Sequence, residues 1–216
     1  MKEDICTIPI NEIFDESDGC PFCRLRKKLE DRALDYISGA AMMEPDIRIK
    51  TNEKGFCEKH YAGLVSVGKR LPVALMLQSH CNEIRFSLFG GGASAKKKAE
   101  KARAFHSGCY VCDSVDFNFR NLLVQFTRMY KGDDDFRKAF TLQPQLCLPH
   151  YADLLSVGEK ELDKRSFAKL SDDCDLMLAR TLKEEYDRIS AFCKSFDYNS
   201  EITPDGKAIE KMIDVL

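Results

Sequence analysis

The stretch CEKHYAGLVSVGK at residues 57–69 recurs without gaps as CLPHYADLLSVGE at residues 147–159, with eight of thirteen positions identical. Both copies begin with a Cys-x-x-His pair and continue into an apolar segment with helical spacing. A long-period repeat of this kind indicates a chain built from two related units. The interpretation of the remaining sequence follows from this duplication.

A second pair of segments lies upstream of each copy. GCPFC at residues 19–23 corresponds to GCYVC at residues 108–112. Between the Cys-x-x-Cys pair and the Cys-x-x-His pair lie 33 residues in the first copy and 34 in the second. Duplicated Cys-x-x-Cys and Cys-x-x-His sets at matched separations predict metal binding, because zinc sites use these ligands in such pairs.

Three thiolates and one imidazole complete the tetrahedral shell that structural zinc prefers, with no position left for a substrate. We therefore predict zinc as the cofactor, with two ions per chain. The predicted ligands are Cys20, Cys23, Cys57 and His60 in the first repeat and Cys109, Cys112, Cys147 and His150 in the second. Pairing within each repeat is favoured because it closes shorter loops. The alternative, in which Cys20 and Cys23 share an ion with Cys147 and His150, stays open.

Other chemistries compete for these cysteines. Buried free thiols do not account for the duplicated spacing, and iron–sulfur clusters generally take four cysteines or two histidines on one iron. The CPFC motif resembles that of glutaredoxin-like proteins, but no βαβ pattern surrounds it and Tyr110 replaces Pro21 in the second copy. A thiol redox enzyme or sensor stays an alternative. The sequence favours a protein that is not an enzyme, and it identifies no catalytic residue.

Charged neighbours predict an inequality between the two sites. A zinc ion with three thiolates carries a net negative charge, which nearby cations stabilise. The first repeat places Arg24, Lys27 and Lys59 near its ligands, whereas the second has Asp113 and Asp116 beside its cysteines. On this basis we expect the second site to be the weaker one.

The sequence predicts an all-α fold. Apolar residues recur at steps of three and four from Leu25 to Ile37 and from Phe119 to Met129, directly after the Cys-x-x-Cys pairs. A stripe from Phe167 to Cys193 predicts a long C-terminal helix. Cys174 and Cys193 lie on this stripe, and we expect both to be buried apolar residues rather than ligands.

The predicted organisation is two pseudo-symmetric Cys3His zinc-bound helical repeats followed by a long helix. The first repeat spans residues 1–89, a linker and basic helix start 90–106, the second repeat 107–160, the long helix 161–195 and an irregular tail 196–216. The tail contains Pro204 and Gly206, which favour irregular backbone. Strand signals are weak, since only residues 46–51 alternate, so we expect at most one short hairpin before Cys57.

Charge and hydropathy limit the partners. Lys and Arg number 33 against 35 Asp and Glu, for a formal net charge of -2, so nucleic-acid binding is unlikely and stays the least favoured alternative. The basic cluster from Lys96 to Arg103 is better explained as a solvated helix face. The N-terminus has no signal-peptide pattern, and no window reaches the roughly 18 apolar residues of a membrane span. We expect a cytoplasmic protein with no membrane partner.

Five segments together resemble a known family: GCPFC at 19–23, MMEPDIR at 42–48, GFC at 55–57 with His60, SH at 79–80 and FDY at 196–198. They are similar to an uncharacterised bacterial family, domain of unknown function 6062, over nearly the whole chain. The resemblance implies a cytosolic, mostly helical protein and supplies no activity, substrate or partner.

Residues 42–48 have no counterpart in the second repeat. The simpler interpretation is that two methionines end a core helix and the next three residues form a turn. A cleft lined by Glu44, Asp46, Arg48 and His80 would instead favour a functional role. With this question open, the sequence predicts a zinc-stabilised interaction or regulatory module with an unknown protein partner.

Overall fold

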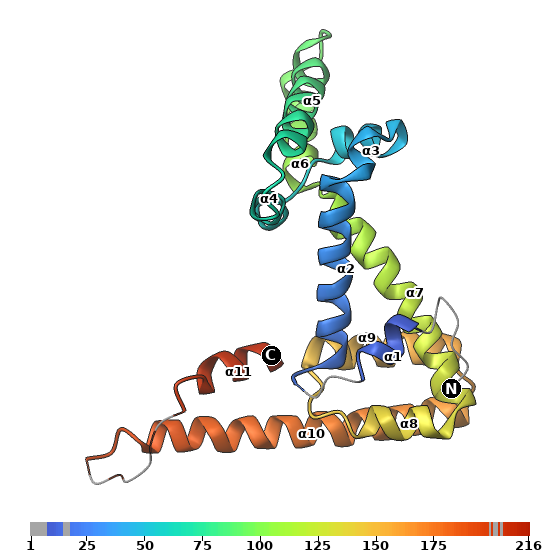
Figure 1. Ribbon diagram of the computed structural model, residues 1–216, viewed down its shortest axis with the longest axis vertical. Coiled ribbons are helices and arrows are strands. Elements are labelled where there is room, and N and C mark those ends of the chain that lie inside the picture. Colours follow the sequence, from blue (N-terminus) through green and yellow to red (C-terminus); the bar gives the residue numbers. More distant parts are fainter. Residues whose placement is uncertain (1–7, 15–17, 199, 201–202, 204) are drawn as a thin grey trace. The chain divides into compact units, whose positions relative to one another are not determined.

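The computed structural model describes residues 8–14, 18–198, 200, 203 and 205–216 (Figure 1). Within them the fold is all-α and contains no strand, as the sequence predicts. The helices are α1 (Ile8–Glu12), α2 (Pro21–Ser38), a 3-10 helix η1 (Ala40–Met43), α3 (Pro45–Lys54), α4 (Glu58–Ser66), α5 (Arg70–Phe89), α6 (Ala95–Ser107), α7 (Tyr110–Gly132), α8 (Asp134–Thr141), α9 (Leu148–Glu161), α10 (Lys164–Lys194) and α11 (Ala208–Val215).

The chain divides into two compact units, and one of them is inserted into the sequence of the other. Unit 1 consists of the described parts of Met1–Arg26 and Phe119–Leu216, and unit 2 consists of Lys27–Asn118. Both boundaries fall inside helices, α2 and α7, so each of these helices contributes residues to both units. Unit 1 is therefore assembled from two segments that are distant in the sequence.

Aromatic side chains fill the core of unit 1. Phe126 of α7 is fully buried, and its ring centroid lies 5.2 Å from that of Phe22, 5.5 Å from that of Phe136 and 5.0 Å from that of Phe140. Rings at such tilted and edge-on contacts bury large apolar areas and add a favourable quadrupole interaction. These contacts join the start of α2, the second half of α7 and helix α8 into one core.

The long helix α10 packs against α9 and α11 in unit 1. Asp163 caps its start by accepting hydrogen bonds from the backbone N–H groups of Arg165 and Ser166. The prediction that Cys174 is a buried apolar residue is confirmed, since its side chain is inaccessible to solvent. The same prediction for Cys193 is wrong, because this residue is exposed near the end of the helix.

The core of unit 2 is mainly aliphatic and surrounds the second half of α2. Its buried members are Leu34, Ile37, Phe56, Leu64, Val73, Met76, Cys109, Val111 and Val115. Helix α3 packs against α5, and α5 pairs with α6 (Figure 1). The hairpin anticipated before Cys57 is replaced by α3: Pro45 occupies the first turn of this helix, where its missing N–H costs nothing.

The tail differs from the predicted irregular segment. Helix α11 occupies Ala208–Val215, and both terminal residues of this helix are fully buried. Burial of its apolar side against unit 1 stabilises a helix too short to form alone. Pro204, which favoured the irregular interpretation, lies outside the described residues.

Replacing Phe126 tests the aromatic core. We expect Phe126→Ala to lower the free energy of unfolding by about 3–5 kcal/mol, because a large ring is lost from a closely packed site. Phe117 lies on the same helix but is 68% exposed, so Phe117→Ala should change stability by less than about 0.5 kcal/mol. Chemical denaturation of both variants measures the difference, and equal effects would contradict this description of the core.

Candidate metal centres

The structure brings the eight predicted ligands into two clusters. Cluster A contains Cys20, Cys23, Cys147 and His150, and cluster B contains Cys57, His60, Cys109 and Cys112. In each cluster the four ligand atoms all lie within 4.8 Å of one another. The preference for pairing within each repeat is wrong, because each cluster takes a Cys-x-x-Cys pair from one repeat and a Cys-x-x-His pair from the other. Cluster A belongs to unit 1 and cluster B to unit 2.

Each cluster lies where two helices begin. Cys20 immediately precedes α2 and Cys147 is the N-cap of α9, whereas Cys57 is the N-cap of α4 and Cys109 immediately precedes α7. Unpaired backbone N–H groups in a first helical turn favour a thiolate. The backbone N–H of Cys112 shows this directly, since it donates to Cys109 Sγ at 3.4 Å.

The distances in cluster A match one tetrahedral ion. Cys23 Sγ lies 3.6 Å from Cys147 Sγ, and His150 Nδ1 lies 3.0 to 3.6 Å from the three sulfurs. With Zn–S bonds of about 2.3 Å and a Zn–N bond of about 2.0 Å, tetrahedral geometry separates two sulfurs by about 3.8 Å and sulfur from nitrogen by about 3.5 Å. The side chains therefore fit the ion with small adjustments.

Cluster B has the same spacing. Cys57 Sγ lies 3.9 Å from Cys112 Sγ, and His60 Nδ1 lies 3.1 to 3.4 Å from the three sulfurs. Both histidines thus present Nδ1 to their clusters. The donor set and the distances agree with a Cys3His metal site in each unit.

Cluster B has an additional carboxylate that the sequence interpretation missed. His60 Nε2 lies 2.6 Å from Glu30 Oε1, and Lys59 Nζ lies 2.7 Å from the same oxygen. An Nε2–H donated to Glu30 leaves the Nδ1 lone pair free for a metal and fixes the orientation of the ring. One signal was available in the sequence: Glu30 falls on the apolar stripe of α2, in register with Leu34 and Ile37, where a charge needs a partner.

Close packing shifts the pKa values of the ligands in opposite directions. Hydrogen bonds from Cys147 and then Cys23 lower the pKa of Cys20, whereas hydrogen bonds with Cys147 and Cys20 raise the pKa of Cys23. In cluster B, burial and then Cys109 raise the pKa of Cys112 to about 12. Thiolates this close repel one another, so they cannot all ionise readily without a cation among them. A divalent ion would remove this repulsion.

The histidine of cluster A is held differently from that of cluster B. Burial lowers the pKa of His150, but hydrogen bonds with Cys147 and Cys20 outweigh it and raise the pKa to about 9. Its ring lies 5.2 Å from the ring of Phe119 and 6.1 Å from that of Phe22. Among the described residues, no carboxylate contacts this imidazole. Aromatic rings therefore hold the imidazole of His150 in cluster A, whereas the Glu30 carboxylate holds the imidazole of His60 in cluster B.

We expected the site of the second repeat to bind metal more weakly because the cations lie near the ligands of the first repeat. This reasoning does not apply to the observed clusters, since each cluster contains ligands of both repeats. Arg24 is close to cluster A, where it donates to the backbone carbonyl of Ile13 at 2.6 Å, whereas Lys54 pairs with Asp113 beside cluster B. Both clusters therefore have cations nearby.

Of the four residues left open by the sequence, Glu44, Arg48 and His80 each have a separate partner. Tyr36 donates to Glu44 at 2.9 Å, and Asp46 lies exposed in the first turn of α3. Arg48 donates to Ser79 Oγ at 2.7 Å, which ties α3 to α5.

His80 supports the turn that precedes cluster B. Its Nδ1 lies 2.6 Å from the backbone carbonyl oxygen of Asn52, and the ring is 8% exposed. Gly55 ends α3 with φ 63°, and a Cβ there would lie 2.4 Å from His80 Nε2. Only glycine fits this turn, which leads directly into Cys57. His80 therefore has a structural role next to the metal ligands.

The fold and the clusters together define a helical protein with two Cys3His-type clusters that could hold metal ions. The chain belongs to the family DUF6062, a family of unknown function, whose model matches residues 1–211. No curated protein and no solved structure matches the chain. The described helices include none with the length and apolar character needed to cross a membrane.

Removing the charge of Glu30 tests its role in cluster B. We expect Glu30→Gln to weaken metal binding at cluster B by about 10- to 100-fold, because the ligand imidazole loses its carboxylate partner. Metal binding at cluster A should not change. Competition with a chelator, combined with alkylation of the released cysteines and mass spectrometry, assigns the loss to a cluster.

Asp31→Asn is the matched control, because Asp31 is the next residue of α2 and its partner is the exposed Lys27. Equal metal affinity in Glu30→Gln and Asp31→Asn would show that the carboxylate does not support the site.

Proposed function

We propose that the protein is a zinc-stabilised helical interaction protein whose two metal ions are structural. The observation that carries this proposal is the closed donor set, since each cluster already offers four protein ligands at the spacing of one tetrahedral ion. A catalytic zinc usually keeps one position for water or substrate. The ligands proposed are the eight cysteines and histidines of clusters A and B.

Zinc is favoured over other metals by the chemistry of the ligands. Thiolate and imidazole donors in a tetrahedral set suit Zn²⁺, whereas magnesium and calcium prefer oxygen ligands. The use of thiolate ligands also supports a reducing compartment, and we propose that the protein is cytoplasmic.

Metal analysis separates this proposal from the redox alternative. We expect about two zinc equivalents per purified chain, and ligand cysteines that resist alkylation until a chelator removes the metal. A redox enzyme or sensor would instead release metal on mild oxidation and form a disulfide between Cys20 and Cys23. The buried, unliganded Cys174 serves as an internal reference for slow alkylation caused by burial alone.

An exposed apolar face on α5 supports an interaction role. Leu71 and Phe89 are each 70% exposed, Phe86 is 58% exposed and Leu75 is 38% exposed. Their spacing places all four on one side of the helix. Large apolar side chains gathered on one exposed face mark interaction sites. We call these four residues the α5 face.

Positive charge surrounds the α5 face. Residues 70–107, which form α5 and α6, contain seven Lys or Arg against two Asp or Glu, although the whole chain has a net charge of -2. Lys98 lies over the ring of Phe89 at 5.5 Å, and Arg85 lies over that of Phe86 at 5.1 Å. The complementary partner is a protein segment that combines apolar and acidic side chains, such as an acidic amphipathic helix.

Photo-crosslinking in cells tests the α5 face. A photoreactive amino acid at Phe89 should give a discrete crosslink to a protein through a segment that contains acidic and apolar residues. The charge reversals Lys97→Glu and Lys101→Glu should reduce the yield several-fold, because they oppose the acidic partner. The same probe at Phe117, an exposed phenylalanine on α7, is the matched control. Equal crosslinking from both positions, or crosslinking to nucleic acid, would contradict the proposal.

A further inference from the structure

Helix α10 continues past the helix that covers its first part. Cys174 is fully buried, and next to it Asp175 accepts a hydrogen bond from the hydroxyl of Tyr151 on α9 at 2.7 Å. The start of α9 lies beside Thr181, whose hydroxyl accepts a hydrogen bond from the backbone N–H of Leu146 at 3.2 Å. Helix α9 therefore runs antiparallel to α10, and the last part of α10 extends beyond it.

This last part of α10 carries an exposed apolar stripe. Leu182, Tyr186, Ile189, Cys193 and Phe196 follow one another at alternating steps of four and three residues, which places them on one side of a helix. Tyr186 is 66% exposed, Phe196 is 73% exposed and Cys193 is exposed as well. Phe196 follows the helix in a tight turn, where its backbone N–H donates to the carbonyl of Cys193 at 3.3 Å. We call these five residues the α10 stripe.

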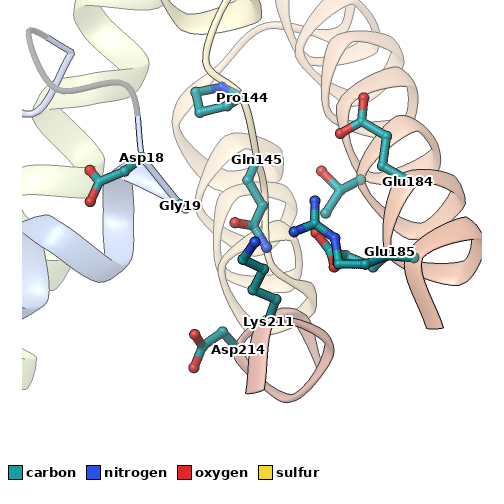
Figure 2. A pocket seen from close by; sticks show the side chains of 10 residues that line it. Asp18, Gly19, Pro144, Gln145, Glu184, Glu185, Lys211 and Asp214 are labelled. Atoms are coloured by element: carbon teal, nitrogen blue, oxygen red, sulfur yellow. The ribbon is translucent and has the colours of Figure 1, made fainter. Parts of the chain in front are cut away.

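Helix α11 covers a different side of α10. Between the two helices lies a cavity of about 390 Å³, lined by Glu184 and Glu185 of α10 and by Lys211 and Asp214 of α11 among others (Figure 2). Among the described residues that line it, none belongs to the α10 stripe. Glu185 lies roughly 60° around the helix from the stripe, as 3.6 residues per turn require. Helix α11 therefore leaves the stripe at the surface.

Charged side chains along one edge of the α10 stripe form a self-complementary pattern. Lys183, Ser190 and Asp197 are seven positions apart, and each directly follows a residue of the stripe. Two copies of α10 that pair antiparallel, with Ser190 at their crossing, place Lys183 of each copy opposite Asp197 of the other. Asp187 and Lys194 face each other in the same way, because they too lie almost symmetrically about Ser190. A parallel pair would instead place each charge opposite itself.

Two charges of this edge have no ion-pair partner within one copy. Lys183 pairs with Asp187 at 2.7 Å, whereas Lys194 and Asp197 form no ion pair with any described residue. The antiparallel arrangement supplies a partner of opposite charge to both. Complementary charges at an interface determine the choice and orientation of the partner more than they increase affinity. This pattern therefore favours a second copy of the chain over an unrelated apolar partner.

We propose that the α10 stripe is a dimer interface at which two copies of this chain pair antiparallel about Ser190. Tyr186 of each copy packs against Phe196 of the other, and Ile189 packs against Cys193. The dimer thus buries a cysteine that lies on the apolar side of α10 and is exposed in one copy. The stripe spans only about four helical turns, so we expect a dissociation constant in the micromolar range. This interface is independent of the α5 face, which belongs to unit 2.

Sedimentation equilibrium of the zinc-loaded full chain tests the interface. The chain should show a monomer–dimer equilibrium between about 1 and 200 μM. Tyr186→Ser should weaken dimerisation by about tenfold or more, because each dimer loses two buried aromatic side chains. Leu176→Ser is the matched control, since Leu176 is 71% exposed on the same helix but lies off the stripe. It should dimerise as the unmodified chain does.

Charge reversal tests the antiparallel arrangement. Lys183→Glu alone, or Asp197→Lys alone, should weaken dimerisation by about tenfold, because like charges then face each other at both ends of the interface. An equimolar mixture of these two variants should restore dimerisation, since opposite charges then face each other again. Circular dichroism and zinc content should stay unchanged, because both residues are exposed.

Alkylation of Cys193 gives an independent readout. With reagent in excess, its rate should fall as the chain concentration rises through the dissociation constant, because the second copy covers the thiol. Cys81 is the matched control, since it is an exposed cysteine of α5 in unit 2. Its rate of alkylation should not depend on the chain concentration.

Three results would overturn the proposal. The first is a chain that stays monomeric at about 200 μM. The second is dimerisation to which Tyr186→Ser and Leu176→Ser make the same difference. The third is dimerisation that neither single charge reversal weakens, or that the mixture of the two variants fails to restore.

Discussion

The meeting of the four cysteine and histidine side chains of cluster A is the constraint on which the rest of unit 1 depends. Cys23 and Cys147 are 124 positions apart, and the whole of unit 2 lies between them in the sequence. The chain therefore leaves unit 1, folds a second unit and returns to complete the first. Structural zinc sites contribute roughly 10–16 kcal/mol of binding free energy to folding, comparable with the roughly 5–15 kcal/mol net stability of a whole protein. An ion at cluster A would thus be sufficient to hold two distant segments together.

Loop length could not select the correct pairing. Loop-closure entropy grows slowly, by about 0.6 kcal/mol for each doubling of length, so closing the longer loop costs only about 1 kcal/mol more than closing a loop within one repeat. Side-chain packing easily outweighs a difference of this size. Phe22, two residues after Cys20, packs against Phe126 and Phe140, which places the start of α2 in the core of unit 1. Both pairings are compatible with the sequence. Tertiary contacts determine that each cluster combines ligands of both repeats.

The spacing of ligands and the periodicity of apolar residues predicted the elements that these local patterns determine. They did not predict the elements that depend on contacts with distant parts of the chain. The ligand set, the helices after each Cys-x-x-Cys pair and the long helix α10 follow from spacing and periodicity. Residues 46–51 alternate like a strand, yet Thr51 is buried and Ile49 is 57% exposed, as a helix beside α5 requires. Helix α11 owes its formation to burial against unit 1. A cavity near cluster A is lined by residues from four segments of the chain, 18–19, 144–145, 181–188 and 211–214, so no local signal could have shown it.

The exchange of ligands clarifies how the two halves of the chain are related. Each repeat supplies half of each cluster, so one repeat alone could complete a site only with a second copy, as in domain-swapped dimers. The 89-residue offset between GCPFC and GCYVC places Glu30 opposite Phe119. Glu30 contacts His60 in cluster B, and Phe119 packs against His150 in cluster A. Equivalent positions thus support equivalent histidines, one through a charged hydrogen bond and the other through an aromatic ring. The two clusters have the same set of three cysteines and one histidine, and they differ in the group that orients the imidazole, which controls its basicity and its freedom to move.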